Sequence, residues 1–369
     1  MDAQTVEAYG ILSAETFKSE STHTVNPPKR ILVFQTAFLG DVILTLPMVQ
    51  VLHEHYPEAV IDVVTTPKAA EFLSNHPAIG DIIKYDKRKT QKGFRGILAM
   101  AIFLRRRSYD LAIVPHRSFR SSLVVAASGI PVRIGFSTAA GKFFYNRIAA
   151  YDTSQHEVER NLALLRPLNI EPARKVLPTL FPSLHDVQST DKFLFEREIL
   201  RQNFMIAIAP GSVWNTKRWL LERFAELASL LAHDGYEVLI IGGPEDEALG
   251  KAITELTKHK QIYDATGKLS LLQSAEVIRR CKVLVTNDSA PLHIGVAVRT
   301  PVVAVFGATV PEFGFAPYGE HDVVVETMGL PCRPCAIHGG NTCPIGTFVC
   351  MKNIETRMVY EKVLQAVDK

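Results

Sequence analysis

The chain has 369 residues, of which 47% are hydrophobic and 21% are charged, a composition typical of globular proteins. No apolar run approaches the ~20 residues of a membrane-spanning helix, and no basic segment followed by an apolar stretch indicates a secretory signal. These features exclude disordered, fibrous and integral membrane proteins, and five cysteines are too few for a disulfide scaffold. The length predicts two domains, and we expect a cytoplasmic location.

The net charge of +3 is unevenly distributed along the chain. Residues 27–180 carry 21 Lys and Arg against 12 Asp and Glu, a balance of +9, whereas residues 1–26 and residues 181–369 each carry −3. Such an excess favours an anionic partner for the first half of the chain. The alternative is a solvated basic face that only keeps the protein soluble.

From Lys29 onward, short apolar segments alternate with segments of helical periodicity. The polar residues 1–28, which precede them, are expected to form a tail or a short accessory helix. Alternation of this kind predicts a parallel sheet with helices on both faces. In chain order, the expected elements of the first half are the strand 31–34, a helix that begins at Asp41, the strand 60–64, the helix 69–74, the strand 81–85, the helix 93–107 and the strand 111–115.

A proline-rich stretch with Pro172, Pro178 and Pro182 predicts a linker between about residues 170 and 187. The alternation then starts again, so that each half is expected to be its own doubly wound domain. In chain order, the expected elements of the second half are the strand 204–209, the helix 222–234, the strand 236–241, the helix 271–280, the strand 283–286, the helix 292–298 and the strand 302–306.

Polar residues follow several of the expected strands, at the edge where open parallel sheets bind their ligands. After the strand 204–209 come Gly211, Ser212 and Lys217. They offer a close backbone approach, a hydroxyl donor and a point charge suited to phosphate. The loop lacks the second glycine of a P-loop, and its alternative interpretation is an ordinary polar connector.

Two further loops follow strands of the second half. The loop 241–247 ends in three acids, which either accept hydrogen bonds from ribose hydroxyls or favour the dipole of the next helix. In the loop 286–293, Asp288 or Ser289 is expected to cap a helix whose exposed N–H groups form an anion site. His293 belongs either to this site or to the core. Three such loops at one sheet edge predict a pocket for a nucleotide diphosphate.

Asp41 follows the first strand in the segment Leu39–Val42. It either caps the next helix or faces the cleft as a general base that accepts the proton of a substrate hydroxyl. The sequence has no G-x-G-x-x-G after a strand, which argues against a nicotinamide dehydrogenase, and no G-x-S-x-G nucleophile elbow.

Four cysteines lie within 19 residues near the end of the chain: Cys332, Cys335, Cys343 and Cys350. They offer either a zinc or iron site or a reduced structural loop, although their spacing is not that of a standard zinc finger. A redox-active C-x-x-C pair is a third interpretation. Cys281 is expected to be a core residue.

The loops that follow the expected strands resemble those of the ADP-heptose:lipopolysaccharide heptosyltransferases of glycosyltransferase family 9. The similarity covers roughly residues 29–368, and the segment Asn287–His293 together with Lys217 is its most specific part. The other segments that carry it are Ile31–Phe34, Leu39–Ile43, Leu46-Pro47, Pro210-Gly211, Trp219, Gly242-Gly243-Pro244, Thr266–Leu271 and Phe306–Thr309.

The resemblance implies a GT-B architecture, an α/β fold of two Rossmann-like domains that face each other across a cleft. The implied parts are an acceptor-binding domain at 29–180, a nucleotide-sugar-binding domain at 187–352 and a last helix at 353–369 that crosses back to the first domain. The implied activity is inverting transfer of L-glycero-D-manno-heptose from ADP-heptose to the lipopolysaccharide inner core, with no cofactor and no catalytic metal. Asp41 matches the general base, and the residues that match donor contacts are Ser212, Lys217, Glu247, Leu269, Asp288, Ser289 and His293.

The implied acceptor is Kdo-lipid A or its heptosylated form, and no nucleic acid is expected as a partner. Arg117, Arg120 and Arg133 are candidate acceptor contacts, and the run Arg105-Arg106-Arg107 is a candidate for peripheral contact with the anionic inner-membrane surface. The alternatives are transfer of another nucleotide sugar, transfer to a protein, or a metal-binding or redox protein built around the loop Cys332–Cys350. A protein acceptor stays open because a comparable cysteine cluster holds iron in certain heptosyltransferases that modify proteins.

Overall fold

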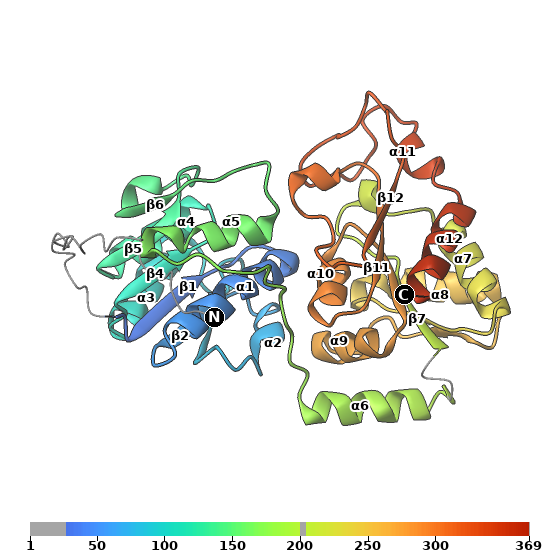
Figure 1. Ribbon diagram of the computed structural model, residues 1–369, viewed down its shortest axis with the longest axis horizontal. Helices are drawn as coiled ribbons and strands as arrows, with labels where there is room; N and C mark the ends of the chain where they lie inside the picture. Colours follow the sequence, from blue (N-terminus) through green and yellow to red (C-terminus); the bar gives the residue numbers. More distant parts are fainter. Residues whose placement is uncertain (1–26, 200–203, 369) are drawn as a thin grey trace, which may run out of the picture.

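The computed structural model describes residues 27–199 and 204–368, and almost all of the expected tail at 1–28 lies outside these ranges. Two parallel six-stranded sheets, each covered by helices, lie beside each other (Figure 1). The first sheet has the strand order β3-β2-β1-β4-β5-β6. Its elements are β1 (Arg30–Phe34), α1 (Leu39–His55), β2 (Val60–Thr65), α2 (Ala70–Leu73), β3 (Ile82–Lys84), α3 (Gly93–Arg105), β4 (Leu111–Val114), α4 (Phe119–Ala127), β5 (Val132–Phe136), η1 (Lys142–Phe144), β6 (Arg147–Ala149), α5 (Glu157–Ala163) and η2 (Arg166–Leu168).

The second sheet has the strand order β12-β11-β10-β7-β8-β9. Its elements are α6 (Leu184–Phe195), β7 (Met205–Ala209), η4 (Asn215–Lys217), α7 (Leu221–His233), β8 (Glu237–Ile240), η5 (Pro244–Asp246), α8 (Glu247–Thr257), β9 (Ile262–Asp264), α9 (Leu271–Arg280), β10 (Val283–Asn287), α10 (Ala290–Ala297), β11 (Val302–Phe306), η6 (Pro311–Phe313), β12 (Val323–Glu326), α11 (Val349–Lys352) and α12 (Thr356–Val367).

The expected alternation of strands and helices is confirmed in both halves. Helices cover both faces of each sheet, and every residue of β7, β10 and β11 is buried. Central strands of this kind, β1 included, are therefore recognisable in the sequence as short runs of apolar residues. Strands β5, β6, β9 and β12, which complete the sheets, were not predicted. Helix α6 was not predicted either. It begins at Leu184 directly after the proline-rich linker and packs against α9.

The C-terminal helix differs from the expectation that it crosses back to the first domain. Helix α12 packs against α7 and against strands β10, β11 and β12 of the second sheet. Val359, Val363 and Ala366 on its buried face join the core formed by β7, β8 and α7. Burial of this apolar face against the second sheet gives the helix its place there.

The two halves are joined by both apolar and polar contacts. Helices α1 and α10 pack against each other, and one continuous cluster of buried apolar side chains extends through both sheets. Glu71 in α2 accepts a hydrogen bond of 2.5 Å from the backbone N–H of Leu271, in the first turn of α9. Lys68 pairs with Glu245 at 2.8 Å on the surface between the halves.

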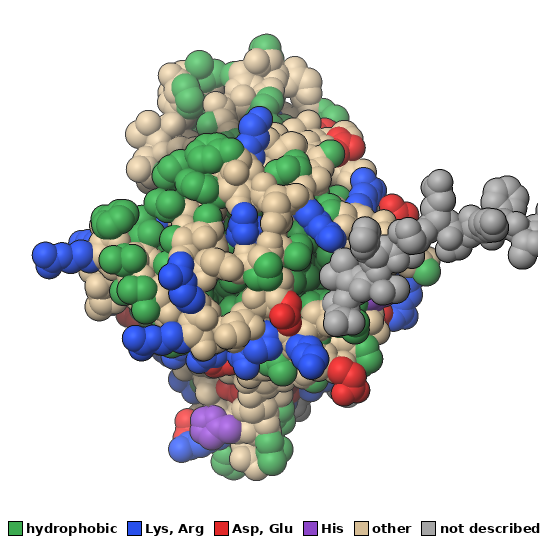
Figure 2. All heavy atoms as spheres, turned by 90° about the vertical axis from the view of Figure 1, so that its left-hand side faces the viewer, with side chains coloured by type: hydrophobic (Ala, Val, Ile, Leu, Met, Phe, Trp, Pro, Cys, Tyr) green, Lys and Arg blue, Asp and Glu red, His purple; other side chains and the backbone are tan. Residues whose placement is uncertain are grey.

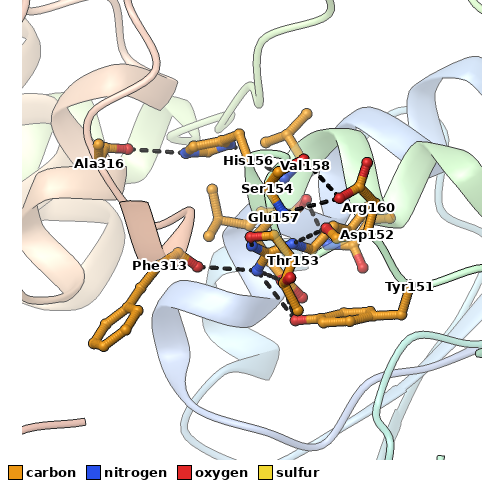
Figure 3. Close-up of polar contacts among 12 residues, drawn as sticks. Tyr151, Asp152, Thr153, Ser154, His156, Glu157, Val158, Arg160, Phe313 and Ala316 are labelled. Atoms are coloured by element: carbon orange, nitrogen blue, oxygen red, sulfur yellow. Dashed lines mark hydrogen bonds and ion pairs between the residues drawn. The ribbon is translucent and has the colours of Figure 1, made fainter. Parts of the chain in front are cut away.

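A polar network around Arg160 joins α5 to the segment that follows β11 (Figure 3). The buried Arg160 guanidinium donates to the carbonyl oxygen of Phe313 at 3.0 Å and to the carboxylate of Glu157 at 3.0 Å. The backbone N–H of Glu157 donates to the carbonyl oxygen of Gly314, and His156 Nε2 donates to that of Ala316. The bond from Arg160 to Phe313 is charge-assisted, and together with the two neutral bonds it holds the start of α5 against the second half.

Candidate functional site

A pocket of about 890 Å³, counted with its space open to solvent, lies between the two halves, at the carboxyl ends of their central strands. It is formed by the first turn of α1, the loops that follow β7, β10 and β11, and the C-terminal cysteine loop. The lining residues are Phe38, Leu39, Gly40, Asp41, Ser212, Val213, Trp214, Lys217, Asp288, Ser289, Ala290, His293, Val310, Phe313, Phe315, Ile337 and His338.

Asp41 contributes the carboxyl group on the first half's side of the pocket. It is the third residue of α1 and not its N-cap, which is Phe38, so the capping role expected from the sequence is wrong in position. Its carboxylate still accepts the backbone N–H of Phe38 at 3.1 Å. Burial, followed by the nearby Glu157 carboxylate, raises the pKa of Asp41 to about 7, although Arg117 opposes the shift. A carboxyl group with this pKa can take up a proton near neutral pH.

His293 lies directly opposite Gly40, across the contact between α10 and α1. A Cβ atom at Gly40 would lie 2.7 Å from His293 Cδ2, so only glycine permits this approach. Burial, together with the cationic Lys217, lowers the pKa of His293 to about 3. The imidazole is therefore neutral at physiological pH and adds no charge to the pocket.

Lys217 and Asp288 form a buried ion pair on the second half's side of the pocket. Lys217 Nζ lies 2.6 Å from Asp288 Oδ2, and both side chains are largely buried. Thr309 Oγ1 donates a further hydrogen bond of 2.7 Å to the same carboxylate oxygen. The pair as a whole is neutral, but it presents the Lys217 ammonium group at the pocket wall and fixes its position through a carboxylate that is itself hydrogen-bonded.

The loop after β10 is held by the side chain of Asn287. Its amide donates to the carbonyl oxygen of Pro210 at 2.8 Å and accepts the backbone N–H of Trp219 at 2.9 Å. Ser289 is the N-cap of α10, and its hydroxyl donates to the carbonyl oxygen of Gly211. In the first turn of α10, Pro291 has no N–H and the N–H of Leu292 donates to the carbonyl oxygen of Ser289, so the N–H of Ala290 is the group that is left to bind an anion beside the loop that carries Lys217.

Of the remaining residues that were expected to bind the sugar donor, the structure places one in the pocket and two outside it. Ser212 lines the pocket, whereas Glu247 and Leu269 lie at the same sheet edge but do not line it. Glu247 begins α8 and lies against Gly267, and the partly buried Leu269 packs against the core. The acid enclosed in the loop after β8 is Asp246, which accepts the backbone N–H of Gly243 and has a pKa raised by burial.

The three candidate acceptor arginines have different surroundings. Arg117 is exposed, stacks over Tyr151 at 4.1 Å, and lowers the pKa of Asp41, which places it near that carboxyl group. Arg120 is already used within the fold, because its guanidinium donates to Tyr85 Oη and to the carbonyl oxygen of Gln91.

Arg133 is misplaced as an acceptor contact. It is the second residue of β5 and therefore lies toward the amino end of the sheet, away from the pocket. Its guanidinium donates to the carbonyl oxygens of Phe144 and Ile130 at 2.8 and 2.6 Å. The sequence shows the chemical type of an arginine but not the carbonyl groups that compete for its donors.

The cysteine loop reaches the pocket through Ile337 and His338. The His338 ring lies 5.9 Å from the Phe38 ring of the first half, and burial together with Lys217 lowers its pKa. The loop is fastened to the wall of the pocket because Gly340 N–H donates to Thr216 Oγ1 at 2.8 Å.

Arg333 fixes the base of this loop. Its guanidinium donates to the carbonyl oxygens of Gly307, Thr309 and Thr327, and it pairs with Glu326. All five cysteines are free thiols. Within 27–199 and 204–368, no group of three or more His, Cys, Asp or Glu residues is arranged to hold a metal ion.

We expect the double variant Cys332→Ser/Cys335→Ser to keep its nucleotide affinity within about twofold, because Arg333 holds the loop.

Arg333→Met should lower the free energy of unfolding by roughly 3–5 kcal/mol, since it leaves Glu326 without its partner. Denaturant unfolding and nucleotide titration of both variants check this. Loss of nucleotide affinity in the double serine variant alone would contradict it.

Sequence reasoning missed His338, Thr309 and Phe38 as parts of the site. The cysteine spacing drew attention to the loop that carries His338, but no pattern indicated that it folds over Lys217. Thr309 lies in a segment singled out only by resemblance, and its bond to Asp288 depends on the pairing of β11 with β10.

Comparisons with known proteins agree with this fold. The family model of glycosyltransferase family 9 (heptosyltransferase) matches residues 97–342. Lipopolysaccharide heptosyltransferase 2 of Salmonella typhimurium is 30% identical over 294 residues, which cover 77% of this chain and 84% of the relative. The protein of that name from Escherichia coli K12 is 29% identical over 293 residues, with the same coverage.

Solved structures give the same assignment. A family 9 glycosyl transferase from Veillonella parvula superposes with a TM-score of 0.80 at 26% identity, covering 92% of this chain and 97% of that one. The ADP-heptose lps heptosyltransferase II of E. coli superposes with a TM-score of 0.75 at 26% identity, covering 92% and 98%. The two facing Rossmann-like units are thus the GT-B architecture, and the chain belongs to glycosyltransferase family 9, the heptosyltransferases.

Proposed function

We propose that this enzyme transfers L-glycero-D-manno-heptose from ADP-heptose to the lipopolysaccharide inner core with inversion at the anomeric carbon. The observation that supports this most directly is one pocket lined by Asp41 from the first half and by Lys217, Asp288 and His293 from the second. The names of the relatives, which are lipopolysaccharide heptosyltransferases, give the same donor and acceptor class.

The second half of the pocket binds the donor in this proposal. Lys217 and the backbone N–H at the start of α10 contact the diphosphate, with the Ser212 hydroxyl as a further donor, while the Ser289 hydroxyl holds the loop at Gly211. As the bond between the sugar and the diphosphate breaks, negative charge develops on the leaving oxygen. Lys217 stabilises that charge, and because Asp288 and Thr309 already hold its position, little reorganisation is needed.

Asp41 acts on the acceptor. Its carboxylate takes the proton of the attacking hydroxyl while the hydroxyl oxygen forms a bond to the anomeric carbon, and ADP leaves with the bonding electron pair. Attack on the face opposite the leaving group inverts the configuration. The exposed Arg117, which lies near Asp41, contacts an anionic group of the acceptor, and the +9 balance of residues 27–180 attracts it.

A lipid-linked acceptor requires the enzyme to work at a membrane surface. Each helix in the described ranges is too short or too polar to cross a membrane. We therefore propose peripheral contact with the anionic cytoplasmic face of the inner membrane.

We expect ADP to bind more tightly than UDP, GDP or CMP in a calorimetric titration of the full chain without acceptor. The acceptor-free design tests the donor site alone. Preference for UDP or GDP would replace the heptose donor by another nucleotide sugar. Failure of all four to bind would contradict a donor site in this pocket.

A further inference from the structure

Helix α3 exposes an apolar stripe to solvent. Phe94, Leu98 and Ile102 are spaced four residues apart and so lie on one face of the helix, where they are 71%, 48% and 43% exposed. Met100 and Leu104 are buried in the core of the first sheet. A helix that covers a sheet normally presents polar residues outward, so this second apolar face needs another explanation.

A second apolar group lies next to the start of α3. Phe119, in the first turn of α4, and Phe143, in η1, are 46% and 69% exposed, and their ring centroids lie 6.2 Å apart. The guanidinium of Arg120 donates to the carbonyl oxygens of Gln91 and Gly93, which holds the first turn of α4 against that of α3. Both first turns follow strands at their carboxyl ends, the edge of the sheet that carries the pocket.

The charges around these side chains are almost all positive. Residues 86–152 contain 13 Lys and Arg and three acids, Asp86, Asp110 and Asp152, of which Asp86 lies in the loop before α3 and accepts the backbone N–H of Lys89. The Asp110 carboxylate accepts the backbone N–H groups of Lys29 and Arg30 at the start of β1, which is the opposite edge of the sheet. Figure 2 shows the left-hand side of the molecule as seen in Figure 1, the side where β1 begins; there too Lys and Arg are interspersed with hydrophobic side chains and acids are few.

The basic residues nearest the apolar group precede α3 or lie in its first turn. The exposed ones are Arg88, Lys89, Lys92 and Arg95. The run expected to contact a membrane, Arg105–Arg107, lies at the other end of the helix. Arg105 donates to the carbonyl oxygen of Ala127, and Arg107 pairs with Asp81 at 2.5 Å, so both are already engaged within the fold.

We propose that these residues form a docking face for an anionic phospholipid bilayer. The docking face is defined by Phe94, Leu98, Ile102, Phe119 and Phe143 with the cations Arg88, Lys89, Lys92 and Arg95. The aromatic and aliphatic side chains enter the boundary between headgroups and acyl chains, and the cations contact lipid phosphates. A second copy of this chain is not a suitable partner, because two such faces would repel each other.

The docking face is placed so that the bilayer would lie on the side of the first half from which the acceptor reaches Asp41. It lies at the same sheet edge as Asp41, so a lipid-linked sugar can reach the base while its acyl chains stay in the bilayer. This step of the inference rests on the proposed lipid-linked acceptor. Vesicle binding itself does not, because it is measured without donor or acceptor.

The test is co-sedimentation of the full chain with vesicles of phosphatidylcholine, alone or mixed with phosphatidylglycerol. We expect binding only to the mixed vesicles, weakened by added salt. The variants Phe94→Ser/Phe143→Ser and Arg88→Glu/Lys89→Glu should each reduce the vesicle affinity about tenfold or more, since the first removes two side chains that enter the bilayer and the second reverses two charges that contact lipid phosphates. Matched controls are Phe195→Ser, an 80% exposed phenylalanine in α6, and Lys260→Glu/Lys282→Glu, exposed in the second half.

The transfer assay separates this inference from the proposed function. With a deacylated, water-soluble acceptor, the docking-face variants should transfer at the wild-type rate, and they should be slower only with acceptor embedded in vesicles. Three outcomes would overturn the docking face and leave the proposed function intact. They are normal transfer without any vesicle binding, equal binding to both vesicle types, and control variants that reduce vesicle affinity as much as the docking-face variants do. Vesicle binding without transfer would contradict the function alone. A stable oligomer that the Phe94→Ser/Phe143→Ser variant disrupts would assign the face to a protein contact and overturn the proposal.

Discussion

Asp41→Asn is expected to lower the transfer rate by about 10²–10⁴-fold, because the amide cannot accept the proton of the acceptor hydroxyl. The affinity for ADP should change little, since Lys217 and α10, which contact the diphosphate in our proposal, are unaltered. In the wild type, the rate should rise with pH through about 7, where Asp41 ionises, and level off above it. The measurements are transfer rates from pH 5 to 9 and ADP titration of both proteins.

The same substitution should make the protein more stable at alkaline pH. The pKa of Asp41 is 3.8 in a model peptide and about 7 in the folded protein. Between these values the folded state binds more protons than the unfolded state, so the stability of the wild type falls as pH rises. The variant lacks this loss. Its free energy of unfolding should exceed that of the wild type by roughly 2–4 kcal/mol above pH 7, and the gain should disappear below pH 4.

Two outcomes would contradict this account of Asp41. A loss of ADP affinity as large as the loss of rate would make Asp41 a donor contact. Equal stability of variant and wild type at pH 8 would mean that burial does not destabilise the ionised carboxylate. Glu54→Gln is a suitable control, because Glu54 is an exposed acid near the end of the same helix and its loss should affect neither quantity.

Local patterns in the sequence determine part of the fold and of the site. Strands such as Ile31–Phe34 were predictable because a strand covered on both faces is apolar throughout. The placement of Lys217 and Asp288 at one edge of the second sheet followed, since strands of a parallel sheet all end on the same side, and Asp41 was placed at the corresponding edge of the first sheet. For these residues, the type of side chain and its position after a strand were enough to predict that they belong to the site.

Contacts between distant segments were not predictable. Arg120 and Arg133 look like acceptor contacts in the sequence, yet carbonyl groups of other segments take up their guanidinium donors. Helix α12 has an amphipathic pattern that fits either half, and only packing against α7 places it on the second. His338 reaches the pocket because Arg333, which precedes it in the same loop, is bonded to the strand edge near Gly307.

The second large effect concerns the ion pair of Lys217 with Asp288. Lys217→Met should weaken ADP binding by about 10–100-fold, the effect of losing one charge-assisted hydrogen bond to phosphate. It should also lower the free energy of unfolding by roughly 3–5 kcal/mol, because Asp288 stays buried without its cation. A single variant therefore cannot separate ligand contact from structure. Calorimetric ADP titration and denaturant unfolding must be measured together.

The double variant Lys217→Met/Asp288→Asn makes this separation. Removing both charges removes the unpaired carboxylate, and the amide introduced at position 288 can still accept the Thr309 hydroxyl, so most of the lost stability should return. ADP affinity should stay low, because no cation replaces Lys217. If ADP affinity returned together with stability, Lys217 would act only by supporting the fold, and the diphosphate would be held by the backbone N–H at the start of α10 and the Ser212 hydroxyl alone. If neither returned, Asp288 would itself be needed to position the loops around Asn287, and the buried pair would be a structural unit of the pocket as well as its source of charge.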